Sequence, residues 1–408
     1  MQYKPIFQII IIVAISFAPI ALLAQADVEK RLQTQLIMTE NGKNIDITEG
    51  VFRISKSLSM DGKKNIIIKG KGIDKTILSF KNQISGAEGI KITNCENITL
   101  EDMTVQDSKG DLIKTMHVKG ITFRRVKAEW TGKPSKDNGS YAFYPVQCEN
   151  VVIDSCIAIG ASDAGIYVGQ SKHITVKNCT AHHNVAGIEI ENSLYADVYN
   201  NLSYMNTGGI LVFDLPDLIQ KRGGYVRVYN NTIKENNHTN FAPKGNIVAK
   251  VPKGSGMLIL ATNNVEIFDN QIVNNQTSGV SIISYYMTEN PIKDKDYYPY
   301  PTGIYIHDNT FERKKGRVPF AGRFAKIYWF KLKFGRDVPH IVYDGIVDKK
   351  TLDNNGQVKP ENRICVRNNK NQSVANMDAG NGFKTVSRDD KVFDCTLQAI
   401  DFKGIAKQ

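Results

Sequence analysis

The chain repeats itself every 22 to 23 residues, and this periodicity excludes most ordinary globular folds. A Gly-Ile or similar pair opens each repeat: Gly165, Gly187 and Gly209 are 22 residues apart, and Gly256 and Gly279 are 23 apart. Each repeat holds two short segments of alternating apolar and polar residues, as in GIYVGQSKHITVKNC. Such alternation is typical of strands. The sequence therefore predicts a solenoid in which one strand-turn-strand unit stacks on the next.

Two columns of equivalent residues support this register. One column holds Cys156, Cys179, Asn201, Asn231, Asn270 and Asn309, and the other holds Asn184, Asn206, Asn236 and Asn275. Stacked amides bond to each other along a column and satisfy the backbone of the turns. We expect both columns to be structural.

The two ends of the chain differ from the repeats. Residues 1–26 have one lysine, an apolar run and a terminal Ala-Gln-Ala, a pattern typical of a cleavable signal peptide. We expect a periplasmic or secreted protein with no transmembrane span in the mature chain. The segment DVEKRLQTQLI predicts a short helix capped by Asp27 that covers the first coil. We divide the rest into coils with their cap over 27–312, a basic insertion over 313–362, and a last coil and C-terminal cap over 363–408.

The cysteines allow one disulfide prediction. Cys365 and Cys395 are the best candidates for a bond, whereas Cys95 and Cys148 lie two coils apart, too far to bridge. Cys156 and Cys179 are stacked neighbours that fit either a disulfide or two buried thiols.

A formal net charge of +11, or +10 without Lys4 of the leader, is compatible with several anionic partners. Much of it falls between Arg313 and Arg336, which fits either a solvated loop or a surface for acidic glycans. No nucleic-acid motif accompanies the charge, and export removes the chain from nucleic acid, so we expect no nucleic-acid partner.

The entry helix, the segments EGVFRI and KGKGIDKTIL, and the Gly-Ile coils resemble the pectin-lyase-like right-handed parallel β-helix superfold. Between residues 141 and 275, YPVQ, SDAGIYVGQS, VAGIEIENS, TGGILVFDLP and VEIFDNQIVNN are similar to an exported bacterial family of parallel β-helix repeat proteins. The resemblance implies an all-β fold and export; the family's activity is unassigned. It also implies an exported partner resembling a c-type cytochrome.

Motifs of the characterised relatives are missing. The sequence has no Asp-Pro-His-Asp of mannuronan epimerases, no Gly-His-Gly of polygalacturonases, and no Trp-Ile-Asp-His of pectate lyases. None of those mechanisms can be transferred to this chain.

Outward positions of the first strand of each coil form the best candidate site. Tyr144, Tyr167, Glu189 and Leu211 share one column, and Glu191 projects beside it. The strands end in a second column, Gln147, Gln170, Asn192 and Asp214. Tyrosines and carboxyls about 5 Å apart suit sugar stacking and hydrogen bonding. The alternative is an ordinary hydrated strand face.

We assign catalysis to Tyr167, Glu189, Glu191 and Asp214. Two nearby carboxyls suit glycoside hydrolysis, whereas elimination or epimerisation of a uronate needs a cation, a base and often a tyrosine acid. Candidates for substrate binding are Tyr144, Gln147, Gln170, Asn192, Lys221, Arg222, Tyr285 and Tyr286. Three insertions at 215–224, 238–254 and 285–301 break the rhythm, and the third is rich in tyrosine.

Adjacent imidazoles with a carboxylate can bind zinc or copper, which makes Asp163, His182 and His183 a weak metal alternative. The histidines are also weak candidates for a catalytic base. The sequence specifies no cofactor.

Three functional hypotheses remain open. The first is an enzyme, a lyase, epimerase or hydrolase, that acts on an extended polysaccharide, either anionic or neutral. The second is a non-catalytic scaffold that binds glycan or protein. The third is a structural or redox-associated protein paired with the cytochrome-like partner.

Overall fold

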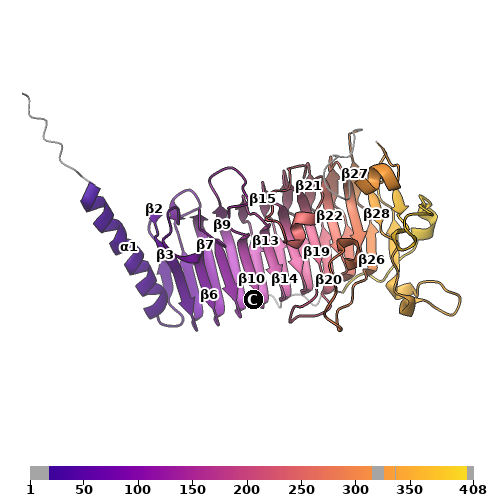
Figure 1. Cartoon of the computed structure of the whole chain (residues 1–408). Coiled ribbons are helices and arrows are strands. Elements are labelled where there is room, and N and C mark those ends of the chain that lie inside the picture. Colours follow the sequence, from indigo (N-terminus) through magenta and orange to yellow (C-terminus); the bar gives the residue numbers. More distant parts are fainter. Residues whose placement is uncertain (1–17, 315–325, 336, 402–408) are drawn as a thin grey trace, which may run out of the picture.

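The computed structural model describes residues 18–314, 326–335 and 337–401. Parallel strands stack along a rod, with helix α1 (Ala18–Met38) at one end (Figure 1). This is the predicted right-handed parallel β-helix, because each coil pairs in parallel with the coils before and after it. Among the described helices, none has the length and apolarity needed to cross a bilayer.

The described strands fall into two sheets. Sheet 1 contains eleven strands: β3 (Lys56–Asp61), β6 (Ser85–Thr93), β8 (Ile113–Met116), β10 (Tyr141–Val146), β13 (Ala164–Gly169), β16 (Ala186–Glu191), β19 (Gly208–Phe213), β22 (Ser255–Leu260), β25 (Ser278–Ile283), β28 (Ile341–Tyr343) and β30 (Val374–Asn376).

Sheet 2 contains nineteen described strands, in most coils a long one followed by a short one. They are β1 (Asn44–Asp46), β2 (Gly50–Arg53), β4 (Lys64–Lys69), β5 (Thr76–Ser79), β7 (Glu96–Gln106), β9 (Lys119–Glu129), β11 (Glu149–Asp154), β12 (Ile157–Ile159), β14 (Lys172–Lys177), β15 (Thr180–His182), β17 (Leu194–Tyr199), β18 (Leu202–Tyr204), β20 (Gly224–Tyr229), β21 (Thr232–Lys234), β23 (Asn263–Phe268), β24 (Gln271–Val273), β26 (Thr302–His307), β27 (Thr310–Glu312) and β29 (Ile364–Arg367).

A continuous apolar core fills the rod, because inward residues of equivalent strands stack in columns. The pairing of sheet 2 aligns one such column from end to end: Ile66, Ile98, Ile121, Val151, Ile174, Ala196, Val226, Val265, Ile304 and Ile364. All ten side chains are buried. A single coil lacks such partners, so the fold is stable only as a stack.

The asparagine columns are confirmed and explain the Asn-Asn pairs of the sequence. Asn200 and Asn230 adopt positive φ values of 55° and 53°, which asparagine tolerates better than most residues. The next residue then points along the column: the Asn231 side-chain oxygen accepts from the Asn201 backbone N–H at 2.9 Å. The column continues beyond the prediction to Asn369, which accepts from Asn309 at 3.0 Å.

Two boundaries differ from the prediction. Helix α1 begins at Ala18 and runs through Asp27, so Asp27 is not its N-cap; Leu32 and Leu36 are the residues that it buries against the first coils. The segment 313–362 is not a single insertion, because it contains β28, which pairs with β25 and β30. The coil pattern was missed there because β28 has only three residues between two long loops.

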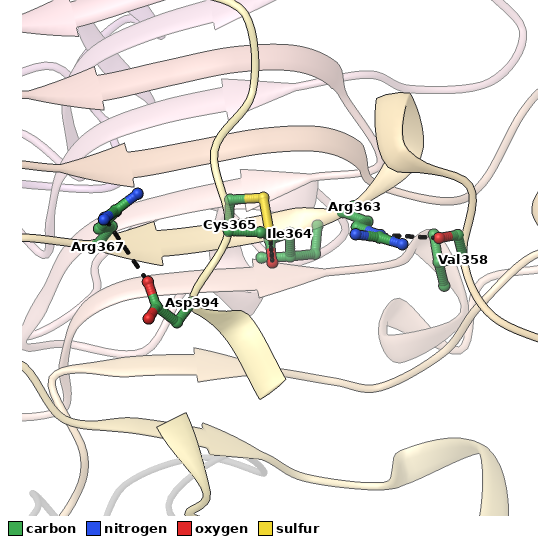
Figure 2. The surroundings of a disulfide bond; sticks show 7 residues. Val358, Arg363, Ile364, Cys365, Arg367 and Asp394 are labelled. Atoms are coloured by element: carbon green, nitrogen blue, oxygen red, sulfur yellow. Dashed lines mark hydrogen bonds and ion pairs between the residues drawn. A yellow bond between two sulfur atoms is a disulfide. The ribbon is translucent and has the colours of Figure 1, made fainter. Parts of the chain in front are cut away.

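The predicted disulfide joins Cys365 of β29 to Cys395 (Figure 2). Cys95, Cys148, Cys156 and Cys179 are buried free thiols. Cys179 fills an asparagine position of the column, because its Sγ accepts from the Cys156 backbone N–H at 3.4 Å as an asparagine side-chain oxygen does elsewhere.

Candidate functional site

The outer face of sheet 1 carries the predicted column of side chains. Register places Lys91 beside Lys114, Lys114 beside Tyr144, Tyr167 beside Glu189, and Glu189 beside Leu211. The rings of Tyr144 and Tyr167 are 5.1 Å apart, which joins the two halves of the column. The face therefore changes along the rod from cationic to aromatic, then acidic, then apolar.

The C-terminal part of this face is covered. Val248 and Val251 of the second insertion, Tyr297 of the third, and Tyr328 and Leu332 of the following loop form an apolar cluster over sheet 1. Glu189 is consequently 1% exposed, Glu191 8% and Asp214 1%. The predicted open strand face is thus a buried acidic cluster beneath loops.

A tyrosine holds the centre of this cluster. The Tyr167 hydroxyl, which is buried with its ring, donates to Glu191 Oε1 at 2.7 Å. Glu189 forms a side-chain hydrogen bond with Glu191, and its Oε2 is buried. The amide of Asn246 donates to Asp163 Oδ2 at 3.3 Å from the second insertion.

Burial is the main cause of the altered proton affinities here. It raises the pKa of Glu191 to about 7 and that of Asp163 to about 8, with Glu191 adding repulsion on Asp163. The pKa of Glu189 is raised as well, by burial and then by the charges of Asp163 and Glu191. This shift favours the protonated form of Glu189, which is the form that donates a hydrogen bond to Glu191.

Asp214 lies between β19 and the first insertion, at the border of the acidic cluster. Burial raises its pKa to about 7, its Oδ1 accepts from the Gly223 backbone N–H at 3.0 Å, and its Oδ2 has no hydrogen bond. The Tyr297 hydroxyl donates to the Asp214 backbone carbonyl at 2.6 Å, which fixes the third insertion over this turn.

Three tyrosines mark the edge of the cover. The ring of Tyr141 lies 4.5 Å from that of Tyr144 and 4.4 Å from that of Tyr167. Lys114 Nζ lies 4.8 Å from the centre of the Tyr144 ring and 3.7 Å from Glu88 Oε1. Tyr141 and Tyr144 are half-buried, so this edge of the cover is partly exposed to solvent.

Asp111 and Tyr141 are members of the site that sequence reasoning missed. The Tyr141 backbone N–H donates to Asp111 Oδ1 at 3.2 Å, and burial raises the pKa of Asp111 to about 6. The sequence does carry a signal for these two residues: the Gly-Ile alignment can be extended upstream to GDLIK, which contains Asp111, and to GSYAFYP, which contains Tyr141.

Several predicted substrate-binding residues instead hold the loops. Asn192 donates to the carbonyls of Leu215 and Gln220, both at 2.9 Å, and Gln170 Oε1 accepts from the Ile219 N–H at 3.0 Å. Gln147 lies in the equivalent turn of the coil before Gln170 and contacts His117 at 2.7 Å.

The predicted cations of the first insertion contact the third insertion. Lys221 Nζ forms an ion pair with Asp294, and the Arg222 guanidinium lies 4.4 Å from the centre of the Tyr298 ring. Tyr285 is buried, whereas its neighbour Tyr286 is 46% exposed. These contacts show that Lys221 and Arg222 hold the first insertion against the third insertion.

The proposed metal ligands are not brought together. His182 Nδ1 and His183 Nδ1 are 2.7 Å apart at the end of β15 in sheet 2, and His182 packs on Tyr204. Asp163 instead neighbours Glu191 and Asn246. Among the described residues, no group of three or more His, Cys, Asp or Glu side chains has the arrangement of a metal site.

The basic stretch is only partly described, because residues 315–325 and Arg336 lie outside the described residues. Arg313 is not a solvated side chain: it is half-buried and its Nη2 donates to the Val338 carbonyl. Burial lowers the pKa of Arg313.

A family model described as right handed beta helix region matches residues 119–296. A pre-neck appendage protein of Bacillus phage B103 is 26% identical over 209 residues, which cover 42% of this chain and 24% of the phage protein. The chain thus spans about a quarter of that relative's length.

Two solved structures share the fold with a TM-score of 0.50. The A-module of Azotobacter vinelandii mannuronan C-5 epimerase AlgE4 is 15% identical, with 86% of this chain and 90% of that chain covered. PfbA, a surface adhesin of Streptococcus pneumoniae, is 11% identical, with 78% and 77% covered. At these identities the likeness shows a β-helix and no activity.

Proposed function

We propose that this protein binds an extended anionic polysaccharide along the outer face of sheet 1 and modifies it by acid–base chemistry at Glu191 and Tyr167. The observation that carries the proposal is the 2.7 Å hydrogen bond from Tyr167 to Glu191 at the end of a column that begins with Lys91 and Lys114. The lysines provide charge for a polyanion, and the tyrosines provide stacking surfaces for its rings.

The two groups have the proton affinities of a base and an acid. Glu191, with a pKa of about 7, is partly ionised at neutral pH and suits a general base. Burial raises the pKa of Tyr167 well above its usual value, so its hydroxyl keeps a proton to donate. Neighbouring groups with separated pKa values are a common arrangement for acid–base catalysis.

Proton abstraction at C5 of a uronate uses both groups. The Glu191 carboxylate takes the C5 proton, and the electron pair of that C–H bond stays on the sugar. The pair either accepts a proton from a water molecule on the opposite face, which is epimerisation and leaves hydroxide to be neutralised by the proton on Glu191, or forms a C4–C5 double bond while O4 leaves with a proton from Tyr167. The fold shared with a mannuronan C-5 epimerase supports a polymeric substrate.

A non-catalytic glycan- or protein-binding scaffold is the second candidate. The burial of Glu189 and Glu191 favours it, since a catalytic carboxyl has to contact the substrate. The fold shared with a surface adhesin is compatible with this function. In this second candidate function, the ligand of the scaffold is either a glycan or an exported partner protein.

We also propose that the protein is located outside the cytoplasm. The Cys365–Cys395 disulfide supports it, because such bonds persist mainly in oxidising compartments. The predicted signal peptide gives the same location.

The test is incubation of the purified protein with polymannuronate, pectate and hyaluronan in D2O. Deuterium at C5, unsaturated uronate absorbance and reducing ends are followed together. We expect Tyr167→Phe and Glu191→Gln to lower turnover about 10²- to 10⁴-fold, and Tyr204→Phe, on the opposite sheet, to leave it unchanged.

The pH profile is a second readout. Turnover should rise as Glu191 ionises around pH 7, and this limb should disappear in Glu191→Gln. Saturable binding of a polymer with no product and no deuterium would support the scaffold instead, and absence of both binding and product would contradict the proposal.

A further inference from the structure

A second surface, at the C-terminal end of the rod, has the features of a carbohydrate site. It combines a group of tyrosines on the third insertion, here named the tyrosine platform (Tyr286, Tyr298 and Tyr300), with a neighbouring hollow. We infer that this surface binds a short segment of uncharged oligosaccharide, independently of the acidic cluster.

The tyrosines of the third insertion fall into two groups, one that faces the core and one that forms the tyrosine platform. Tyr285 and Tyr297 face inward and pack against each other with ring centres 5.2 Å apart. The ring of Tyr300 lies 5.4 Å from those of Tyr286 and Tyr298, and Tyr286 is 46% exposed. These rings meet one another at angles of 63° and 57°, so they are not stacked face to face. Arg222 lies over the Tyr298 ring, which leaves the exposed Tyr286 and the half-buried Tyr300 as the rings open to a ligand.

Asp348 joins the tyrosine platform to the hollow. Its carboxylate forms a hydrogen bond with the Tyr298 hydroxyl and lines the hollow, which has a volume of about 500 Å³. That volume lies in the range of small-ligand sites. Apolar walls and a few polar groups surround the space, among them Tyr343, Val347, Phe393, Asn376, Gln357 and Arg363.

The hollow is built from segments that are tied together. The disulfide between Cys365 and Cys395 holds two of its walls, and Arg363 Nε donates to the Val358 carbonyl at 3.0 Å (Figure 2). Asp394 also pairs with Arg367 at 3.7 Å. A wall fixed in this way loses little conformational freedom when a ligand binds.

The charge balance indicates an uncharged ligand. The charged residues that line the hollow are Asp348, Asp394 and Arg363, a net charge of −1, and both aspartates have a polar partner, Tyr298 for Asp348 and Arg367 for Asp394. This differs from the lysine column of sheet 1 in a protein of net charge +11. A polyuronate gains no attraction here, whereas sugar hydroxyls find amides, carboxylates and a guanidinium.

The experiment is calorimetric titration of the purified protein with cellohexaose, maltohexaose and mannohexaose, and with hexamannuronate for comparison. We expect a neutral hexasaccharide to bind, with affinity lowered about three- to tenfold by Tyr286→Ala or Tyr300→Ala. Tyr225→Ala is the matched control, because Tyr225 is 42% exposed on β20. Glu191→Gln should leave this binding unchanged, even if polymer turnover is lost.

Three results would overturn the inference: no neutral probe binds, Tyr225→Ala weakens binding as much as Tyr286→Ala, or Glu191→Gln abolishes it. Tighter binding of hexamannuronate than of every neutral probe, with the same dependence on Tyr286, would contradict the charge assignment. Thermal unfolding of each variant separates lost binding from lost folding.

Discussion

Asp214 shows how a single buried carboxyl links the site to the stability of the protein. Its pKa rises from 3.8 to about 7, and burial is the largest cause. The folded state therefore binds this proton more tightly than the unfolded chain does. The stabilisation is fully present below about pH 4 and is lost as the pH rises through 7.

Asp214→Asn should remove part of this pH dependence. Asparagine keeps the acceptor for the Gly223 N–H and carries no charge at any pH. The melting temperature of the wild type should fall between pH 5 and pH 8, and that of the variant should fall less, so that their difference grows with pH. Calorimetry at several pH values measures this, with Asp296→Asn, an exposed residue of the third insertion, as control. An equal slope in Asp214→Asn and the wild type would contradict the account.

Individual residues also show where prediction from the sequence stops. Tyr144, Tyr167 and Glu189 were placed in the correct column because a strand period of two leaves no choice of face. Lys221 and Arg222 were assigned to substrate, and their contacts with Asp294 and Tyr298, more than 70 residues away, are not encoded by any local pattern.

The asparagine column is the most regular element of the fold. In Asn231, the side-chain oxygen accepts from Asn201, and the amide donates to the carbonyls of Val198 and Tyr229 and to Asn270 Oδ1, each at 2.9 Å. One side chain thus satisfies backbone groups of two coils.

Asn231→Ala should lower the free energy of unfolding by at least about 1–3 kcal/mol, because it leaves the buried Asn201 N–H without an acceptor. Urea denaturation measures the loss. Gln271→Ala, an exposed position on the neighbouring strand β24, is the control and should be nearly neutral. Equal, small effects of the two variants would show that the column adds little stability.

The three insertions are the elements that change the character of the site. Their positions were predicted from the broken rhythm, and a role near the binding face was expected. That they cover the acidic cluster follows from apolar residues such as Val248, Val251 and Tyr297, which pack on Leu211 and Leu258 of sheet 1. An apolar residue in a loop does not by itself reveal which surface it will cover.

On the scale of the whole molecule, the C-terminal segment returns along the rod. Beyond Cys395 it reaches sheet 2, where the Ile400 N–H donates to Glu266 Oε2 at 3.0 Å and the Ile400 carbonyl accepts from Arg227 at 3.4 Å. The disulfide therefore anchors a segment that spans from the last described coils to β20 and β23.

Cys395→Ser, or reduction of the disulfide, should release this segment. The bond closes a loop with a sequence separation of 30, for which chain entropy predicts a stabilisation of about 3–4 kcal/mol. Hydrogen exchange should show lost protection over residues 393–401 and unchanged protection in β11 to β17. Loss of protection throughout the rod would mean that the disulfide supports the whole stack instead.

The sequence alone determined the β-helix, its register, the asparagine columns and the identity of the outward residues on sheet 1. These features depend on neighbours in the chain or on equivalent positions one coil away, so a 22-residue period specifies them. Only the tertiary structure decided that the carboxyls are buried, that Tyr167 bonds to Glu191, and that the tyrosines of the third insertion divide between core and surface. Those outcomes depend on contacts such as Tyr297 with Asp214, 83 residues apart, which form only when separate loops meet over the finished rod.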